Sequence, residues 1–257
     1  MVPIRQGDGT GLAAKGYSQV RKGDGTVLWN AIPDSEANQK LAHRWPLDDV
    51  NGTVEDSVGE ANGSNNGVTS VSGEYAGGSA GEGDGVGDHI SIDINDIQTW
   101  INDTTTDHAV ALTVDFSQLP DDRQSFFGVY DRDTSGTSVF ELTYHNPGVR
   151  YELRDADGDN ERIETDDDLP EGEVRIVINA KNNDQADFES WFNQAEVSNS
   201  PTGSTGYSNI EFKPDLFLFA ANDGGVSDAT EAILDDICLF NDSLTQAEIE
   251  SYDNPWE

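Results

Sequence analysis

The strongest constraint on the fold is a two-residue alternation of apolar and polar side chains in short runs. In AVALTVDF, residues 109–116, the apolar side chains that share one side of an extended chain are Val110, Leu112, Val114 and Phe116. Similar alternation occurs in SVFELTYH, VRYELRD and VRIVINAK, while LFLFAA is apolar on both sides. Because successive side chains of a strand point to opposite faces, these runs predict half-buried strands, and LFLFAA predicts a central one.

Turn-forming sequences separate these runs, among them HNPG, DADGDN and ANDGG. Short strands at this spacing favour an all-β fold of two packed sheets. The region from residue 42 onward, roughly 215 residues, is long enough for one large core. We therefore expect a sandwich domain over residues 42–257.

The first residues differ in texture from the rest of the chain. RQGDGT at 5–10 and RKGDGT at 21–26 repeat each other, and Asp-Gly is a strong hairpin-turn signal. Tyr17–Val20 and Val27–Trp29 are the expected arms of the second hairpin. Because a solitary hairpin is marginally stable in water, residues 1–31 are expected to pair with other chains as an assembly segment. Residues 32–41 are expected to form a linker or one helical turn.

The strong negative net charge limits the possible partners of the chain. Fifty Asp and Glu face fourteen Lys and Arg, for a formal net charge of −36 spread along the chain. Apolar residues at 35% and aromatic residues at 9% still provide a core, so the chain is expected to fold. Molar salt screens such repulsion, which indicates a halophilic protein; an acidic, calcium-loaded extracellular protein is the alternative. Duplex nucleic acid is not an expected partner, because the cations do not cluster along the sequence.

Processing signals are missing from the sequence. The N-terminus MVPIRQGDGTGLAAKGY has no apolar signal-peptide region, and no run approaches the ~20 apolar residues of a membrane span. The single cysteine, Cys238, alternates with Leu234, Asp236 and Phe240 and predicts a small buried side chain. We expect a protein made in the host cytoplasm that reaches the outside only within a virus particle.

Five elements in order carry a family resemblance. They are AHRWPLDD (42–49), EDSVGEANGSNNGV, GDGVGDHISI (83–92), ADFESWFNQAEV and ILDDICLFNDSLTQAEIESY. Together they resemble the laminin G-like, concanavalin A-like jelly-roll domains over residues 42–252. This resemblance implies that the last strand returns beside the first and that a final helix from Leu244 to Tyr252 covers the rim. The sequence departs from the family pattern at Gly83 and at Gln194, where the pattern has an aromatic residue and a glycine.

A shorter resemblance concerns the N-terminus. VRKGDGTVLWN is similar to N-terminal segments of structural proteins from tailed viruses, including those of haloarchaea, where such a hairpin docks the chain on the particle. The resemblance implies other virion proteins as partners of residues 1–31 and the virion as the location.

Catalysis is not expected. Jelly-roll glycosidases carry E-x-D-x-(x)-E on one strand, and neither ISIDIND nor EAILDDI supplies both glutamates. The four histidines have no zinc-site spacing, and nucleophile motifs for serine or cysteine are missing.

A metal site and a ligand site are the remaining candidates. DADGDNERIETD resembles a calcium loop through Asp155, Asp157, Asp159 and Asp166, but Gly158 lies two positions early and the twelfth residue is Asp. Calcium and solvated turn acids both fit these letters, and Asp48, Asp56 or Asp223 are rim alternatives. A sugar site needs an exposed aromatic side chain beside polar groups. The candidates are Trp191, Asn193, Arg150, Glu152 and Arg154, with packing of Trp191 under a loop as the alternative.

The combined hypothesis is a non-enzymatic structural protein of a halophilic tailed virus, of capsid-surface, turret or tail-fibre type. Its lectin-like sandwich would contact host surface glycans or glycoproteins, and its N-terminal segment would build a homo-oligomer. A cellular lectin-like adhesion module and a glycosidase fold without a recognisable catalytic pair are the alternatives.

Overall fold

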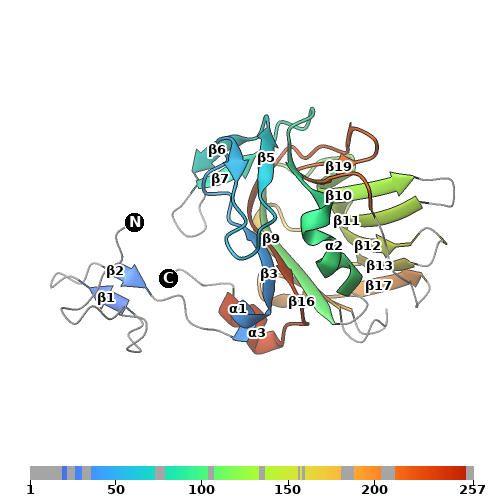
Figure 1. Cartoon of the computed structure of the whole chain (residues 1–257). Coiled ribbons are helices and arrows are strands. Elements are labelled where there is room, and N and C mark those ends of the chain that lie inside the picture. Colours follow the sequence, from blue (N-terminus) through green and yellow to red (C-terminus); the bar gives the residue numbers. More distant parts are fainter. Residues whose placement is uncertain are drawn as a thin grey trace.

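Two β-sheets packed face to face form the body of the protein (Figure 1). The computed structural model describes residues 19–21, 27–30, 36–72, 79–103, 107–132, 137–155, 157, 160–180, 188–203 and 212–252. Nearly all strand pairs are antiparallel, and the short helices are α1 (Glu36–Lys40), α2 (Ile94–Asp103) and α3 (Gln246–Tyr252). The predicted all-β jelly-roll sandwich is confirmed.

The first sheet carries a polar outer surface. Its strand order is β17 (Asn199–Gly203), β13 (Asn160–Thr165), β12 (Gly148–Arg154), β11 (Thr137–His145), β10 (Gln124–Arg132), β18 (Leu216–Leu218), β8 (His89–Ile92), β5 (Gly63–Asn66) and β4 (Thr53–Val54). Of two further short strands, β19 (Ala221–Asn222) pairs with β10, and β20 (Val226–Ser227) pairs with β19. The apolar LFLFAA run thus forms β18 and β19 in the middle of this sheet.

The second sheet closes the sandwich. Its order is β16 (Ala195–Val197), β15 (Glu189–Phe192), β14 (Gly172–Ala180), β9 (His108–Phe116), β21 (Ile233–Phe240), β7 (Ser79–Glu82) and β6 (Thr69–Ser72). Strand β3 (Leu41–Trp45) pairs with β21, with Ile237 opposite Trp45. The last strand therefore lies beside the first strand of the sandwich, as the jelly-roll resemblance implies.

The main core lies between the sheets. Strand β9 contributes Leu112 and Phe116, and β11 of the first sheet contributes Phe140 and Leu142. Helix α2 connects the two sheets and adds the buried Trp100, whose indole Nε1 donates to the Phe240 carbonyl at 3.2 Å. Alternation alone accounts for these positions, because each inward side chain follows the period of its strand.

A second apolar cluster lies on the other side of the second sheet. Its members are Ala37 of α1, Ile249 of α3, Leu244, and the outward side chains Ala109, Ala111, Val177, Trp191, Cys238 and Phe240. Strand β9 is consequently buried on both sides along most of its length, and the half-buried prediction for residues 109–116 is wrong. Of the two alternatives predicted for residues 32–41, the helical turn is found, as α1; Leu41 begins β3, and Ala37 is fully buried.

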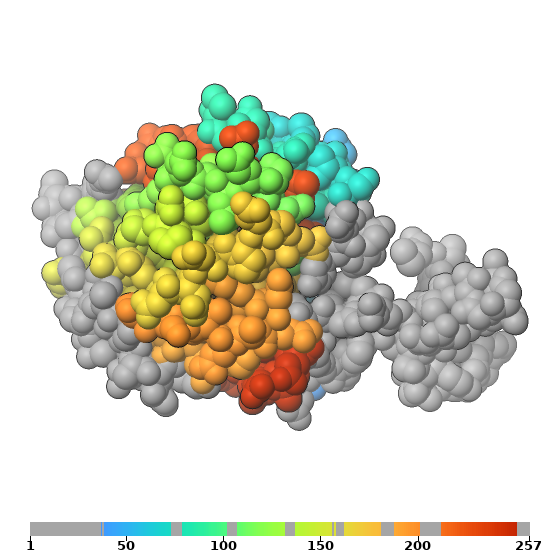
Figure 2. Space-filling view, turned by 180° about the vertical axis from the view of Figure 1, so that it is seen from behind, coloured from blue at the N-terminus to red at the C-terminus, as the bar shows by residue number. Residues whose placement is uncertain are grey.

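Hydrogen bonds at the end of α1 and at the start of α3 hold these two helices, which lie over the second sheet. Thr245 caps α3: its Oγ1 and backbone N–H donate to Glu248 Oε2 at 2.8 and 2.7 Å, and the Glu248 N–H donates back to Thr245 Oγ1 at 3.3 Å. This reciprocal pattern is a capping box. Lys40, at the end of α1, donates to the Ser243 carbonyl at 2.7 Å and to Glu248 at 3.0 Å. In Figure 2 the surface of α3 (dark red) lies beside that of β15 and β16 (orange).

A bulge in β21 changes which side its residues face. The register shifts between Asp235 and Cys238, and Asp236 has a left-handed φ of 50°. Leu234 consequently lies in the main core, whereas Cys238 lies in the second cluster. The predicted placement of both on one side is wrong, because a bulge adds one residue to a strict two-residue period. The predicted burial of Cys238 is confirmed.

The N-terminal hairpin pairs as the sequence predicts. Strands β1 (Gln19–Arg21) and β2 (Val27–Asn30) form a separate two-stranded sheet, with Val20 opposite Trp29. Both GDGT copies, residues 7–10 and 23–26, lie outside the described residues. Within the described part of the chain, none of the helices is long and apolar enough to cross a membrane.

Candidate functional site

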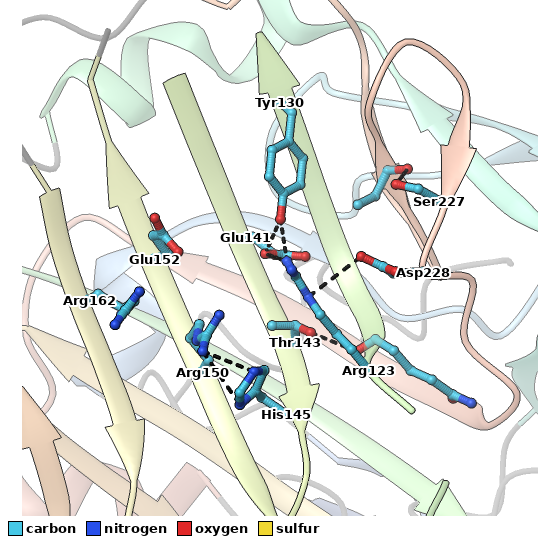
Figure 3. Close-up of polar contacts among 12 residues, drawn as sticks. Arg123, Tyr130, Glu141, Thr143, His145, Arg150, Glu152, Arg162, Ser227 and Asp228 are labelled. Atoms are coloured by element: carbon cyan, nitrogen blue, oxygen red, sulfur yellow. Dashed lines mark hydrogen bonds and ion pairs between the residues drawn. The ribbon is translucent and has the colours of Figure 1, made fainter. Parts of the chain in front are cut away.

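Polar side chains occupy the outward side of four neighbouring strands of the first sheet. We call this surface the arginine face and define it by Tyr130, Glu141, Thr143, His145, Arg150, Glu152, Arg154, Arg162 and Glu164, with Arg123 and Asp228 from flanking loops. The opposite sides of the same strands lie in the main core. Figure 3 labels most of these side chains, and those of the strands project from one side of adjacent strands.

Strand register explains how these residues meet. Glu141 lies opposite Glu152, which lies opposite Arg162; in a parallel row, Thr143 lies opposite Arg150, which lies opposite Glu164. Side chains opposite each other in antiparallel strands are close enough to interact. The arginines gather although they are spread over forty positions of the sequence, so the expectation of unclustered cations is wrong for this face.

Arg150 is the best anchored cation of the strand rows. Its Nε donates to Glu164 Oε1 at 2.6 Å and its Nη2 approaches the same oxygen at 2.5 Å. Nη2 also donates to His145 Nε2 at 3.0 Å. Burial and the adjacent Arg150 lower the pKa of His145, so the ring stays neutral and accepts this hydrogen bond.

A fully buried carboxylate lies at one side of the face. Glu141 has no exposed surface, and its Oε2 accepts hydrogen bonds from Tyr130 Oη at 2.6 Å and from Arg123 Nη2. Arg123 also forms an ion pair with Asp228, with Nε and Oδ2 3.5 Å apart. Burial raises the pKa of Glu141, and Arg123 opposes this shift only in part. Figure 3 shows these four side chains pointing toward one another.

Two other arginines on the face, Arg154 and Arg162, form longer ion pairs than Arg150 does. Among the described residues, the polar contact of the Arg154 side chain is a long ion pair with Glu152, with Nε and Oε1 3.7 Å apart, and both side chains are partly or largely buried. The side chains of Arg123, Arg154, Arg162 and Glu164 are each about one third exposed. The face therefore offers charged donors and acceptors side by side at a surface that solvent reaches.

The predicted ligand residues divide between two places. Arg150, Glu152 and Arg154 lie on the arginine face. Trp191 is 5% exposed and packs in the second cluster, on the other sheet, so the expected exposed aromatic is wrong. Trp191 is packed, as the alternative prediction states. The residues that share its cluster come from α1, α3 and neighbouring strands.

Asn193 is exposed at the tip of the hairpin between β15 and β16. It and Gln194 have φ values of 47° and 67°, the conformation of a type I′ turn. The Asn193 side-chain oxygen accepts a hydrogen bond from the Arg175 N–H at 2.7 Å. Gln194 thus adopts the turn that a glycine makes in the family pattern, and Asn193 serves this turn on the sheet opposite the arginine face.

The calcium-like spacing is also separated by the fold. Asp155 and Asp157 follow β12, whereas Asp166 follows β13, so the six residues of β13 place them roughly 20 Å apart. Asp166 accepts a hydrogen bond from Ser200 Oγ at 2.6 Å. A single site formed by all four acids is therefore wrong, and Asp159 lies outside the described residues. Among the residues that the structure describes, no group of three or more His, Cys, Asp or Glu is placed to hold a metal ion.

Asp56, one of the rim alternatives, has a different role. Its carboxylate accepts hydrogen bonds from the backbone N–H groups of Arg44, Val58, Gly59 and Ala61, and His43 Nδ1 lies 2.7 Å from its Oδ2. Burial by itself raises the pKa of Asp56, but these hydrogen bonds lower it to about 2. Asp56 therefore organises the 56–61 loop.

Sequence reasoning missed Arg123, Tyr130, Glu141, His145 and Arg162. The alternation of SVFELTYH and VRYELRD already placed Glu141 beside the predicted Glu152 on outward positions. Arg123 and Asp228 carried no such signal, because loops far apart in the chain bring them to the face.

Comparisons with known proteins show the fold. The binding domain of Paraclostridial Mosquitocidal Protein 1 matches with a TM-score of 0.63 and 12% identity, over 85% of this chain and 53% of that chain. The binding domain of botulinum neurotoxin serotype D matches with a TM-score of 0.62 and 12% identity, over 85% and 52%. Trypanosoma rangeli sialidase, as a covalent intermediate with 2,3-difluorosialic acid, matches with a TM-score of 0.57 and 14% identity, over 87% and 34%.

No protein-family model matches the sequence, and no curated protein matches it. The chain spans about half the length of the two binding domains and about one third of the sialidase. Two of these three similar structures are titled as binding domains, and the third is a sialidase. At such low identity the chain shares with them the β-sandwich fold alone.

Proposed function

We propose that this protein is a lectin-like module that binds surface glycans through the arginine face. The observation that carries the proposal is charge balance. The face holds four of the nine arginines and four carboxylates, in a chain whose formal net charge is −36. A surface with donors and acceptors in alternation suits sugar hydroxyls, each of which both donates and accepts.

The neighbouring structures support a binding role. Three are titled as binding or receptor-binding domains, two of them of botulinum neurotoxins and one of a mosquitocidal protein, and one sialidase structure contains sialic acid. These properties belong to those proteins, and they raise the expectation of glycan recognition on a shared sandwich. Fold likeness alone does not assign a ligand, so the argument depends on the residues of the face.

A binding role is favoured over glycoside hydrolysis. Glu141 and Glu152 lie directly opposite each other, which is a possible arrangement for two catalytic carboxylates. However, Glu141 has no exposed surface and already accepts from Arg123 and Tyr130. Release of reducing ends from a polysaccharide above a blank reaction would overturn the non-enzymatic proposal.

The binding test uses a glycan array with the purified protein in molar salt. We expect Arg154→Ala to weaken binding, because this arginine has only a long ion pair to replace. Lys213→Gln is the matched control, since it removes one positive charge from an exposed side chain outside the face. Equal binding by wild type, Arg154→Ala and Lys213→Gln would contradict the assignment of the face.

We also propose that the module acts on the particle of a halophilic tailed virus, with residues 1–31 as the assembly segment and the host surface as the target. The charge, the GDGT repeat and the sandwich support this context. Deleting residues 1–30 should leave a folded monomer that attaches poorly to hosts, whereas unchanged stoichiometry would contradict the assembly role. Dialysis from molar salt into dilute buffer should reduce the β-sheet circular dichroism signal. An unchanged melting temperature would contradict halophilic adaptation.

A further inference from the structure

Glu141 is a buried group of the arginine face that is satisfied on one oxygen only. Both hydrogen bonds that it accepts go to Oε2, while its Oε1 is buried and has no hydrogen-bond partner among the described residues. Ser125 Oγ is a second buried oxygen for which the described part of the chain provides no hydrogen-bond partner. Both residues line the space beside Gly128, where an added Cβ would lie 3.1 Å from Ser125 Oγ and 3.2 Å from Glu141 Cγ. A buried acceptor and a buried hydroxyl thus lie near each other, without a bond that satisfies them.

Arg123 is the movable part of this arrangement. It lies in the loop before β10, so its side chain can turn without moving a strand, and that side chain is 31% exposed. Only its Nη2 makes hydrogen bonds, to Glu141 and Tyr130, and its Nε pairs with the partly exposed Asp228 at 3.5 Å. Nη1 of Arg123 has no hydrogen-bond partner among the described residues. The partly exposed Arg123 side chain therefore keeps one guanidinium nitrogen, Nη1, that is not committed to a described residue.

We propose that Arg123 binds a carboxylate group on the glycan, and that Glu141 takes up a proton from solvent when Arg123 turns toward this ligand. The proposal rests on the glycan-binding function and adds the chemical class of the ligand, an acidic sugar. A carboxylate matches the planar fork of a guanidinium with two parallel hydrogen bonds. Only a proton moves in this step, from water to a Glu141 oxygen.

The surroundings of Glu141 explain why a proton is needed. The charged or titratable groups that face it are Arg123 and Tyr130 from the β10 side, Asp228 from the loop after β20, and Glu152 from β12. Once Arg123 turns away, two further carboxylates and a neutral phenol remain around a buried anion. Burial of an unpaired charge favours the neutral form. Protonation removes the charge that burial disfavours.

The sign of the pH effect follows. In the free protein Arg123 keeps the Glu141 pKa lower than it is in the complex, so binding takes up protons. Affinity for an acidic sugar then rises as pH falls, starting above the ordinary range of a carboxyl group because burial already raises the pKa of Glu141. A neutral sugar has no reason to draw Arg123 away and should show no such dependence.

The test compares methyl glucuronide with methyl glucoside, which differ in the carboxylate alone. Affinities are measured by NMR titration of the full chain in molar salt between about pH 5.5 and about pH 8, where the glucuronide stays ionised. We expect glucuronide affinity to rise by up to about tenfold per pH unit on acidification, the slope for uptake of one proton. Glucoside affinity should stay constant. A pH-independent glucuronide affinity, or equal slopes for both sugars, would overturn the proton coupling and leave the glycan-binding function standing.

Glu141→Gln provides the matched variant, because it mimics the protonated side chain. It should bind glucuronide with a flat pH profile and, near pH 8, up to about tenfold more tightly than wild type. A wild-type slope in the variant would contradict the role of Glu141. If the variant does not fold, the two-sugar comparison in the wild type still decides the matter. Binding of neither sugar, with a glycan array also empty, would instead contradict the proposed function itself.

Discussion

The outward sides of both sheets carry arginines paired with carboxylates, but helices cover the second sheet and solvent reaches the first. On the second sheet, α1 and α3 cover Ala111, Val177 and Trp191, and a buried network joins Arg175 to Asp236. On the first sheet, the arginine face keeps Arg123, Arg154 and Arg162 about one third exposed. The comparison teaches that the alternation of a strand divides its residues between two sides, whereas the covering elements decide what each side does.

Arginines illustrate the difference most directly. Asp236 holds Arg44 at 2.5 Å and Arg175 at 3.2 Å, and Arg175 also donates to Thr113 Oγ1 at 3.0 Å. Burial raises the pKa of Asp236, but the two arginines more than offset this and the pKa is lowered. Arg154, by contrast, has one ion pair of 3.7 Å. Buried pairs are costly to break, and exposed pairs contribute little to stability.

The largest expected effect is the loss of Arg175. Arg175→Ala should lower the free energy of unfolding by about 3 kcal/mol or more, because it leaves Asp236 buried with a single cation. Chemical denaturation in molar salt measures the change. Arg154→Ala, the counterpart on the open face, should change stability by less than about 0.5 kcal/mol. Similar losses in the two variants would break the distinction between the faces.

Trp191 tests whether the covered face is a packing surface. Trp191→Ala should cost about 3 kcal/mol, since a buried indole is removed from the cluster under α3. Its Nε1 has no hydrogen-bond partner among the described residues, so Trp191→Phe should cost much less. Glycan affinity of the folded fraction should not change in either variant. Reduced affinity with unchanged stability would return Trp191 to the ligand site.

Asp235, on β21 of the covered second sheet, should make the stability of the protein depend on pH. Burial and the adjacent Asp236 raise its pKa to about 7, above the unfolded value, so stability is full at low pH and is lost as pH rises through 7. Asp235→Asn stays neutral and should gain on the order of 1 kcal/mol over wild type at high pH, after allowance for partial exposure, and nothing at low pH. Melting temperatures across the pH range measure this gain. Asp236→Asn, its neighbour, should destabilise throughout, and a gain there would contradict the assigned ion pairs.

The smallest effect on stability belongs to Arg154, where the effect on binding should be the clearest. Isothermal titration with a glycan identified on the array should show weaker binding by Arg154→Ala and unchanged binding by Arg175→Ala after correction for the folded fraction. The opposite pattern would assign recognition to the covered sheet.

Much of the fold follows from local patterns in the sequence. Alternation in residues 109–116 and 138–145 predicts the inward side chains, and Thr245 with Glu248 forms the capping box of the expected closing helix. The alternation fails at Asp236, since the bulge there has no reliable signature in the neighbouring letters. The calcium-loop spacing of residues 155–166 misleads for a related reason. Acidic residues at this spacing lie close together within a loop, but they lie far apart when a strand such as β13 separates them.

The sequence by itself determined which side chains share a side of each regular strand, how the chain closes, and that the surface is strongly acidic. Only the tertiary structure decided that Trp191 is buried, because α1 and α3, which share its cluster, lie more than fifty residues away in either direction. It also decided that Arg150, Arg154 and Arg162 share one face, since strand order and register join them, and that the loop residue Arg123 lies beside Glu141 of that face. The physical reason is the same in both cases: a two-residue period specifies orientation, while burial and charge pairing depend on which distant segment packs against that side.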